Sequence, residues 1–397
     1  MKNILVIGYS TRNIVCSARR AGYNVYSIDA FTDSDLVECA SGSKVFDLGE
    51  TLDIKDISRE KIVEHIDSFG LYFDAIVLGS GFEMMDLTSL SYPILNNSPR
   101  IMQDVSDKEI FAKKLASMDI PHPHTYDRSA IRHIRYPVMV KPKCAGGGRF
   151  NRMAGDMNEL NSYLDEISNM GKDTGMNMAI SADDMLIQEF VSGVPVSVSV
   201  ISTKQSAVAI AVNEQMIGVS WLTGLPFAYC GNITPYETPY AEKMCAMAEE
   251  LILKFGLVGS NGVDFMLTDT GPVVIELNAR FQGSMDTVEL ATGINLFDAH
   301  VKAFAGELLP ELQTRPETKQ YAARAIVYAD KCVLMDELAI NGLRNEPVVD
   351  IPKSGYVAYV DEPVTSILHT GTTRDDVMAN IKKSVCVFRK IIDENTV

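Results

Sequence analysis

Residues 262–280 restrict the fold more than any other part of the chain. They read GVDFMLTDTGPVVIELNAR, so two runs of alternating apolar and polar side chains flank a short polar turn. This pattern predicts a β-hairpin closed by a three-residue loop, with Gly271 at the left-handed position. In that register Asp264 lies directly opposite Glu276.

The two faces of the expected hairpin differ in chemistry. Because side chains alternate along a strand, Glu276, Asn278 and Arg280 share one face, toward which Asp264 also points. The other face is apolar and is expected to pack inward through Phe265, Leu267, Val273, Ile275 and Leu277. Two carboxylates and an amide oxygen are the hard oxygen ligands that Mg²⁺ prefers. The alternative is a solvated polar face, which would normally mix lysines with the acids.

The first hundred residues alternate short apolar runs with helical stretches. The expected strands are 3–7, 25–28, 45–48 and 75–78, and the expected helices are 14–21 and 57–69. Strand, helix and strand in alternation indicate an open parallel sheet. Ligands bind outside the carboxyl ends of such strands, which places the turns at 8–13, Asp29 and 79–83 near a candidate substrate pocket.

A dinucleotide site at this sheet is disfavoured. The first turn reads Gly-Tyr-Ser-Thr-Arg-Asn and lacks the second and third glycines that let a pyrophosphate approach a helix. Asp29 occupies the place of a ribose-binding acid, but it does so without those glycines.

Charge and apolar patterning exclude several classes of partner. The net charge of −16 argues against nucleic acid, whose phosphates require basic surfaces. No apolar run approaches the ~20 residues that a membrane span needs. The seven cysteines form no Cys-x-x-Cys pair, which predicts reduced thiols, no structural zinc and a cytoplasmic protein.

A glycine-rich loop follows a strand that ends in a lysine. After the expected strand 138–141, Lys141 is followed by PKCAGGGR, which contains Gly146, Gly147 and Gly148. Glycines let backbone N–H groups approach phosphate oxygens, and the lysine adds a fixed charge. The loop is not a P-loop, and a flexible surface turn is the alternative.

The segment LIQEFVSG suits contact with a nucleobase. Here a strand bends, so Gln188, Glu189, Phe190 and Val191 can offer backbone groups to an adenine edge. By itself the segment could equally be an ordinary strand. Neighbouring patterns predict an antiparallel-rich α+β region, with strands at 185–190, 196–201, 208–212, 263–267 and 273–277 and helices at 158–169 and 240–255.

Taken in order, these motifs resemble the ATP-grasp superfamily of carboxylate–amine and carboxylate–thiol ligases. Ser106-Asp107-Lys108 looks like the family's first nucleotide lysine, and Lys141 looks like the second. The run from Thr292 to Leu296 is similar to its counterpart in biotin carboxylase and carbamoyl-phosphate synthase. The nearest subgroup that the sequence suggests is the archaeal carboligase-like proteins related to biotin carboxylase.

The resemblance implies a fold and four parts. It predicts a multidomain α/β and α+β chain, in which a pre-grasp domain with an open parallel sheet precedes ATP-grasp lobes. The expected parts are a Rossmann-like pre-grasp domain (1–105), a small lobe with a glycine-rich lid (106–192), a large lobe with the metal site (193–315) and a C-terminal α+β segment packed on the large lobe (316–397).

The resemblance also implies the roles of the motif residues. ATP and Mg²⁺, which Mn²⁺ can replace, are the expected cofactors. The metal ligands would be Asp264, Glu276 and Asn278, and Arg280 and Lys141 would act in catalysis. The nucleotide would be bound by Lys108, Lys141, Gly146, Gly147, Gly148, Gln188, Glu189, Phe190 and Val191.

The expected function is an ATP-dependent ligase that activates a carboxylate as an acyl phosphate and couples it to an amine. The alternatives are a bicarbonate-activating carboxylase-like enzyme and a non-catalytic nucleotide-binding regulator. The expected partners are small-molecule carboxylates and amines, without nucleic acid or membrane, and a homodimer is an expectation from the family. Pro195 departs from the family, because a ribose-binding glutamate would normally stand there.

Residues outside the motifs are harder to assign. Arg12 and Ser80 of the N-terminal loops, together with residues 215–235, are the candidates for the substrate pocket. Trp221 suits either that pocket or core packing. His122 and His124 fit an interdomain loop, and Asp183 fits a solvated turn.

Overall fold

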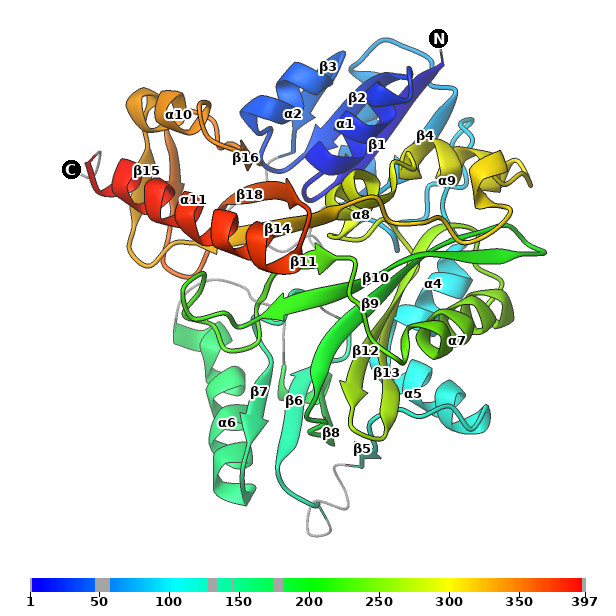
Figure 1. Ribbon diagram of the computed structural model, residues 1–397, viewed down its shortest axis with the longest axis vertical. Helices are drawn as coiled ribbons and strands as arrows, with labels where there is room; N and C mark the ends of the chain where they lie inside the picture. The colour runs from blue at the N-terminus through cyan, green and yellow to red at the C-terminus, as the bar shows by residue number, and fades with distance from the viewer. Residues whose placement is uncertain (1, 47–57, 128–133, 145, 174–180, 395–397) are drawn as a thin grey trace.

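The N-terminal part of the computed structural model is a parallel sheet covered by helices (Figure 1). The structure describes residues 2–46, 58–127, 134–144, 146–173 and 181–394. The sheet has the order β3-β2-β1-β4. Its strands are β1 (Asn3–Gly8), β2 (Asn24–Asp29), β3 (Gly42–Val45) and β4 (Ala75–Leu78), and its helices are α1 (Arg12–Arg20), α2 (Ser34–Cys39) and α3 (Arg59–Asp67). β3 therefore begins before the expected strand at 45–48, of which 47 and 48 lie outside the described residues.

An eight-stranded sheet forms the centre of the molecule. Its order is β13-β12-β9-β10-β11-β14-β18-β16, and its neighbouring strands pair antiparallel. The strands are β9 (Val194–Ser202), β10 (Ala207–Ile217), β11 (Tyr229–Thr234), β12 (Gly259–Thr268), β13 (Gly271–Asn278), β14 (Tyr321–Tyr328), β16 (Val348–Val349) and β18 (Pro363–Gly371). Strands from residues beyond 316 thus extend the same sheet that carries the hairpin.

Helices cover this central sheet and join it to the N-terminal part. They are α4 (Pro99–Ser106), α5 (Lys108–Ser117), α7 (Ala241–Lys254), α8 (Met285–Thr292), α9 (Leu296–Phe304), α10 (Glu337–Leu343) and α11 (Arg374–Glu394). Ile14 and Val15 of α1 share one buried cluster with Val288 of α8 and Phe297 of α9. This common core fixes the N-terminal loops beside the central sheet.

The small lobe projects from the other side of the molecule (Figure 1, bottom). Its four-stranded antiparallel sheet has the order β5-β8-β6-β7 and packs on α6 (Met157–Asp173). The strands are β5 (Thr125–Tyr126), β6 (Val138–Pro142), β7 (Arg152–Ala154) and β8 (Met185–Glu189), and β15 (Val333–Met335) pairs separately with β17 (Tyr356–Ala358). The expected combination of a parallel sheet with antiparallel α+β lobes is confirmed.

The hairpin has the expected register at the acids but a different loop. Asp264 pairs with Glu276 as predicted, whereas Thr268 pairs with Gly271, so the loop has two residues rather than three. A β-bulge between Asp264 and Phe265 absorbs the difference. Because the bulge shifts the alternation in β13, Val274 is fully buried and Ile275 lines the main cavity. The expected inward packing of Val273 and Ile275 is therefore wrong, while that of Phe265 and Leu277 is confirmed.

The expectation that all cysteines are reduced is wrong for one pair. Cys16 of α1 and Cys39 of α2 form a disulfide, with Cα atoms 5.2 Å apart. The two residues are 23 positions apart, and no spacing pattern in the sequence marks them. Among the described residues, no helix is long and apolar enough to cross a membrane.

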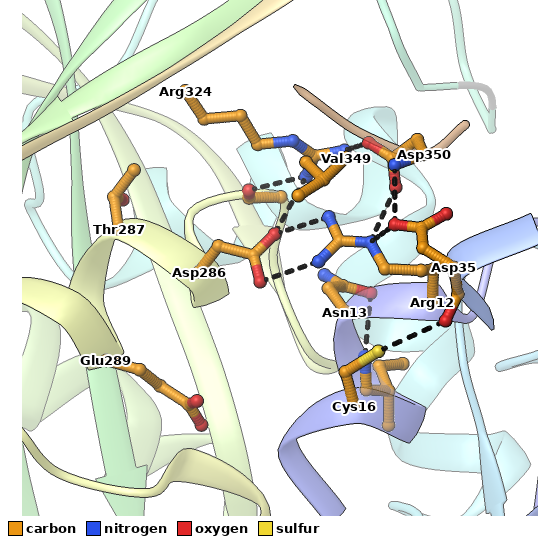
Figure 2. Close-up of polar contacts among 12 residues, drawn as sticks. Arg12, Asn13, Cys16, Asp35, Asp286, Thr287, Glu289, Arg324, Val349 and Asp350 are labelled. Carbon is orange, nitrogen blue, oxygen red and sulfur yellow. Dashed lines mark hydrogen bonds and ion pairs between the residues drawn. The ribbon is translucent and has the colours of Figure 1, made fainter. Parts of the chain in front are cut away.

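A buried ion-pair network connects three distant parts of the chain (Figure 2). Arg12 donates two hydrogen bonds to Asp286 of α8, at 3.0 and 2.7 Å, and one to Asp350 at 2.9 Å. Arg324 of β14 donates to the other oxygen of Asp350 at 2.5 Å, and Asp35 lies 3.5 Å from Arg12. Arg12 was expected to line the substrate pocket; instead, it is only 4% exposed and its guanidinium joins the N-terminal helix to α8 and the C-terminal segment.

Candidate functional site

A cavity of about 660 Å³ lies where the N-terminal loops, the small lobe and the central sheet meet. Ser10, Asn13 and Ser80 line it from the carboxyl edge of the parallel sheet. The small lobe, the central sheet and the residues after β13 contribute the predicted residues Lys141, Gly146, Gly147, Gly148, Gln188, Glu189, Phe190, Val191, Asp264, Glu276, Asn278 and Arg280. The predicted site residues other than Lys108 thus gather in one cavity, and Ser80 lies there as expected.

Two carboxyl groups of the hairpin form the acidic wall. Asp264 and Glu276 lie opposite one another on β12 and β13. Burial, reinforced by the charge of Glu276, raises the pKa of Asp264 to about 7. Burial would also raise the pKa of Glu276, but the positive charges of Lys108, Lys141 and Arg280 outweigh it and lower that pKa. Glu276 is therefore the ionised partner near neutral pH, and Asp264 is poised to lose its proton to a cation.

Two buried lysines face this acidic wall. Asp107 caps α5 by accepting hydrogen bonds from the backbone of Glu109 and Ile110, which fixes Lys108 as the first helical residue. The Nζ of Lys108 lies 3.5 Å from Glu276 Oε1. Burial and the neighbouring charge of Lys108 lower the pKa of Lys141 to about 8. Two close cations, each 6% exposed, suit an anion with several oxygens.

The acidic wall fits a divalent cation. Oδ1 of Asp264 is buried and has no hydrogen-bond partner among the described residues, while Oδ2 accepts a 3.1 Å hydrogen bond from Asn278. Within the described part of the chain no three His, Cys, Asp or Glu side chains gather as a metal site. A cation here would therefore be coordinated by two carboxylates and one amide oxygen. That small protein set suits Mg²⁺, which takes its remaining ligands from substrate phosphates and water.

The glycine-rich loop touches the loop that precedes β11. The backbone N–H of Tyr229 donates to the carbonyl of Gly147 at 3.2 Å. Gly148 has a φ of +75°, and a Cβ at this position would lie 1.9 Å from the carbonyl oxygen of Phe227. Gly148 is thus required both by its backbone conformation and by the close approach of Phe227.

We expect Gly148→Ala to lower nucleotide-dependent turnover by about tenfold or more, because a left-handed alanine alone adds roughly 1–2 kcal/mol of strain. The added methyl group would also push the loop away from Phe227 and weaken its contact with Tyr229. Gly146→Ala is the matched control, since nothing lies within 4 Å of its Cβ and its φ is ordinary. Steady-state rates and nucleotide affinity measure the effect, and equal rates in the two variants would contradict it.

The predicted adenine segment borders the cavity. The side chain of Gln188 is buried and donates to Thr125 at 2.9 Å, so it is held by the small lobe. Glu189 is exposed, and its carboxylate accepts a 3.3 Å hydrogen bond from the backbone of His124. Pro195 also lines the cavity, opposite Met266 of β12. Neither the side chain of Pro195 nor that of Met266 can accept hydrogen bonds from ribose hydroxyl groups as a glutamate would.

Arg280 is held by a residue that the motifs did not identify. Its Nε donates to Oε1 of Glu83 at 2.9 Å, and Nη1 donates to the carbonyl of Phe281. Glu83 follows β4, at the sheet edge where ligand-binding loops were expected. The preference of ligands for the carboxyl ends of parallel strands predicted that this loop lies near the site. Nothing in the sequence indicated that Glu83 pairs with Arg280.

Of the two residues Gln215 and Trp221, only Gln215 lines the cavity. Gln215 of β10 lines the cavity and acts to lower the pKa of Asp264, within the stretch 215–235 that was expected to contribute. Trp221 instead packs against the C-terminal core cluster. Core packing is thus its observed role.

Sequence comparisons relate this chain to known proteins. Residues 105–284 match the ATP-grasp domain family. An uncharacterized protein of Methanocaldococcus jannaschii is 25% identical over 373 residues, which cover 92% of this chain and 87% of that protein. The carbamoyl phosphate synthase large chain of Deinococcus radiodurans is 21% identical over 332 residues, which cover 80% of this chain and 31% of the larger one. The chain thus spans about a third of that synthase chain.

Solved structures share the architecture at low sequence identity. The biotin carboxylase domain dimer of Hydrogenobacter thermophilus 2-oxoglutarate carboxylase, in complex with MgADP, ADP and bicarbonate, has a TM-score of 0.75 at 16% identity, covering 96% of this chain and 89% of its own. N5-carboxyaminoimidazole ribonucleotide synthetase from Thermotoga maritima has a TM-score of 0.65 at 18% identity, covering 98% of each chain. Residues 105–284 thus match the ATP-grasp domain family, and the chain shares its fold with biotin carboxylase.

Proposed function

We propose that this protein is an ATP-dependent ligase that activates a carboxylate as an acyl phosphate and couples it to an amine. The observation that carries the proposal is the meeting of Asp264, Glu276 and Lys141 in one cavity, with the Nζ of buried Lys108 3.5 Å from Glu276 Oε1. Acids that bind a cation, beside lysines that bind oxyanions, are the parts that phosphoryl transfer requires.

The charged residues would position the phosphates. Lys108 and Lys141 would neutralise the β- and γ-phosphate oxygens, and the glycine-rich loop would cover them with backbone N–H groups. Asp264, Glu276 and Asn278 would hold Mg²⁺. When bound, the cation would supply neutralisation of the negative charge on the phosphates during transfer of the γ-phosphoryl group. An oxygen of the substrate carboxylate would attack the γ-phosphorus, and ADP would leave.

Arg280 would act at the reacting carbon. Its guanidinium, oriented by Glu83 through a 2.9 Å hydrogen bond, would hold the substrate carboxylate. When the amine nitrogen attacks the acyl phosphate, the same group would stabilise the anionic tetrahedral intermediate before phosphate departs. The loop containing Gly148, in contact with Phe227, would exclude water that hydrolyses acyl phosphates.

ADP release tests the proposal directly. The full chain would be assayed with Mg²⁺-ATP against pools of carboxylic acids and amines, with Glu276→Gln as the inactive control. A pool that stimulates ADP formation by the native protein but not by Glu276→Gln would support the ligase function. Testing the members of that pool one by one would then identify the substrates. Stimulation by bicarbonate without any organic acid would replace the amine ligase with a carboxylase-like activity. ATP binding without stimulation by any pool would point to a regulator.

A further inference from the structure

A second cavity, of about 190 Å³, adjoins the main one. Ser10, Arg324 and Ile326 line both cavities, so the two lie side by side. The second cavity lies between the carboxyl edge of the N-terminal sheet and the C-terminal segment. Its volume is below the range of about 300–1,000 Å³ that whole small-molecule sites occupy, so it suits one end of a larger ligand.

Asp33 lines this cavity with an unpartnered carboxyl group. It is 7% exposed, and within the described residues its carboxyl accepts no hydrogen bond and forms no ion pair. Asp33 precedes α2 at the capping position, yet its side chain does not cap the helix. Burial, with added repulsion from Asp350, Asp29 and Asp35, raises its pKa to about 9. A buried acid without a partner is costly to keep, which points to a ligand that pairs with it.

Aromatic rings form another part of the wall. Tyr9 and Phe31 pack edge to face with centroids 4.9 Å apart, and Phe31 lies 6.4 Å from Tyr356. All three residues line the second cavity. Ring faces attract organic cations, and this attraction strengthens when the site excludes water.

The guanidinium groups nearby already form ion pairs, although the buried Nε of Arg324 has no hydrogen-bond partner among the described residues. Arg324 donates to Asp350 and to the carbonyl of Gly283, and Arg12 is shared by Asp286, Asp350 and Asp35 (Figure 2). The Nζ of exposed Lys353 lies 3.5 Å from the hydroxyl of Thr32. Asp350, Asp29 and Asp35 repel a negative charge on Asp33 and Arg12 attracts it, so carboxyl groups outnumber guanidinium groups around Asp33. The surroundings therefore favour a cation over an anion.

We propose that the second cavity binds the ammonium group at the non-reacting end of a substrate whose reacting group lies in the main cavity. Asp33 would pair with the ammonium group, and Tyr9, Phe31 and Tyr356 would enclose it. This inference rests on the proposed function, because it names the class of substrate: a diamine or an amino acid with a cationic side chain. It concerns a part of the molecule that no ATP-binding motif includes.

Fragment binding to the full chain tests the proposal without any turnover. The probes are n-butylammonium, n-butanol and butyrate, which share one carbon chain and differ in charge, measured by ligand-observed NMR. We expect n-butylammonium to bind about tenfold or more tightly than the other two, and Asp33→Asn to abolish that preference. Because asparagine keeps the size and polarity of the side chain, and the Asp33 carboxyl group does not cap α2, Asn should preserve folding. Phe31→Leu is a second variant that keeps apolar volume and should lower the preference severalfold.

A remote carboxylate provides the matched control. Asp375→Asn removes an acid that is 96% exposed and should leave the preference unchanged. Equal binding of n-butylammonium to the native protein and Asp33→Asn, or tighter binding of butyrate, would overturn the subsite. ADP release by the native protein is read separately. A cation-selective cavity in a protein without ligase activity would support the subsite and reject the ligase, and the reverse result would reject only the subsite.

Discussion

Glu276→Gln is expected to reduce Mg²⁺-dependent ADP formation by at least about a hundredfold, because a bound cation supplies several kcal/mol of charge stabilisation. Glutamine keeps the shape of the side chain but removes the charge that faces Lys108 at 3.5 Å. Asp264 alone would then provide the negative charge of the acidic wall. The pKa of Asp264 should fall in the variant, since the repulsion from Glu276 is removed.

Metal titration separates a ligand role from a structural one. If Glu276 binds the cation, its replacement should raise the Mg²⁺ and Mn²⁺ concentrations needed for half-maximal rate, with little change in melting temperature. Asp269→Asn is the matched control, because this acid lies in the exposed loop of the same hairpin. Near-normal turnover in Glu276→Gln would exclude the metal assignment.

The hairpin shows how far local pattern carries a prediction. The predicted three-residue loop set Asp264 opposite Glu276, and that pairing is observed although the loop is not. A two-residue loop plus a bulge gives the same register at the acids, so the sequence pattern could not distinguish the two. The error appears only between the loop and the bulge, where Val274 rather than Ile275 packs into the core.

The remaining errors concern contacts between distant segments. Arg12 follows an N-terminal strand at the edge where ligands bind, so the sequence favoured a pocket role. Its actual partner Asp286 is 274 residues away, on a helix that local periodicity cannot orient toward α1. The Glu83–Arg280 pair spans 197 residues for the same reason. Asp33 could not be recognised from sequence either. Its position before α2 predicts a side chain that caps the helix, whereas in the structure the side chain does not cap it.

Arg12→Met is expected to destabilise the fold by roughly 3–5 kcal/mol, the usual result of removing one partner from a buried ion pair. Arg12 is 4% exposed, and its loss leaves buried Asp286 and partly buried Asp350 with Arg324 as their one remaining ion-pair partner among the described residues. Chemical denaturation and melting temperature measure the effect. The variant should also loosen the N-terminal loops, because this network joins them to α8 and the C-terminal segment (Figure 2).

Arg344→Met is the matched control for this network. Arg344 pairs with Glu38 of α2 and also links the C-terminal segment to the N-terminal part, but both side chains are about half exposed. Its loss should change stability by less than about 1 kcal/mol, since exposed pairs contribute little. Adding Asp286→Asn to Arg12→Met should recover part of the lost stability, because it removes one uncompensated charge. Equal losses of unfolding free energy in Arg12→Met and Arg344→Met would show that burial does not strengthen the ion pairs of Arg12.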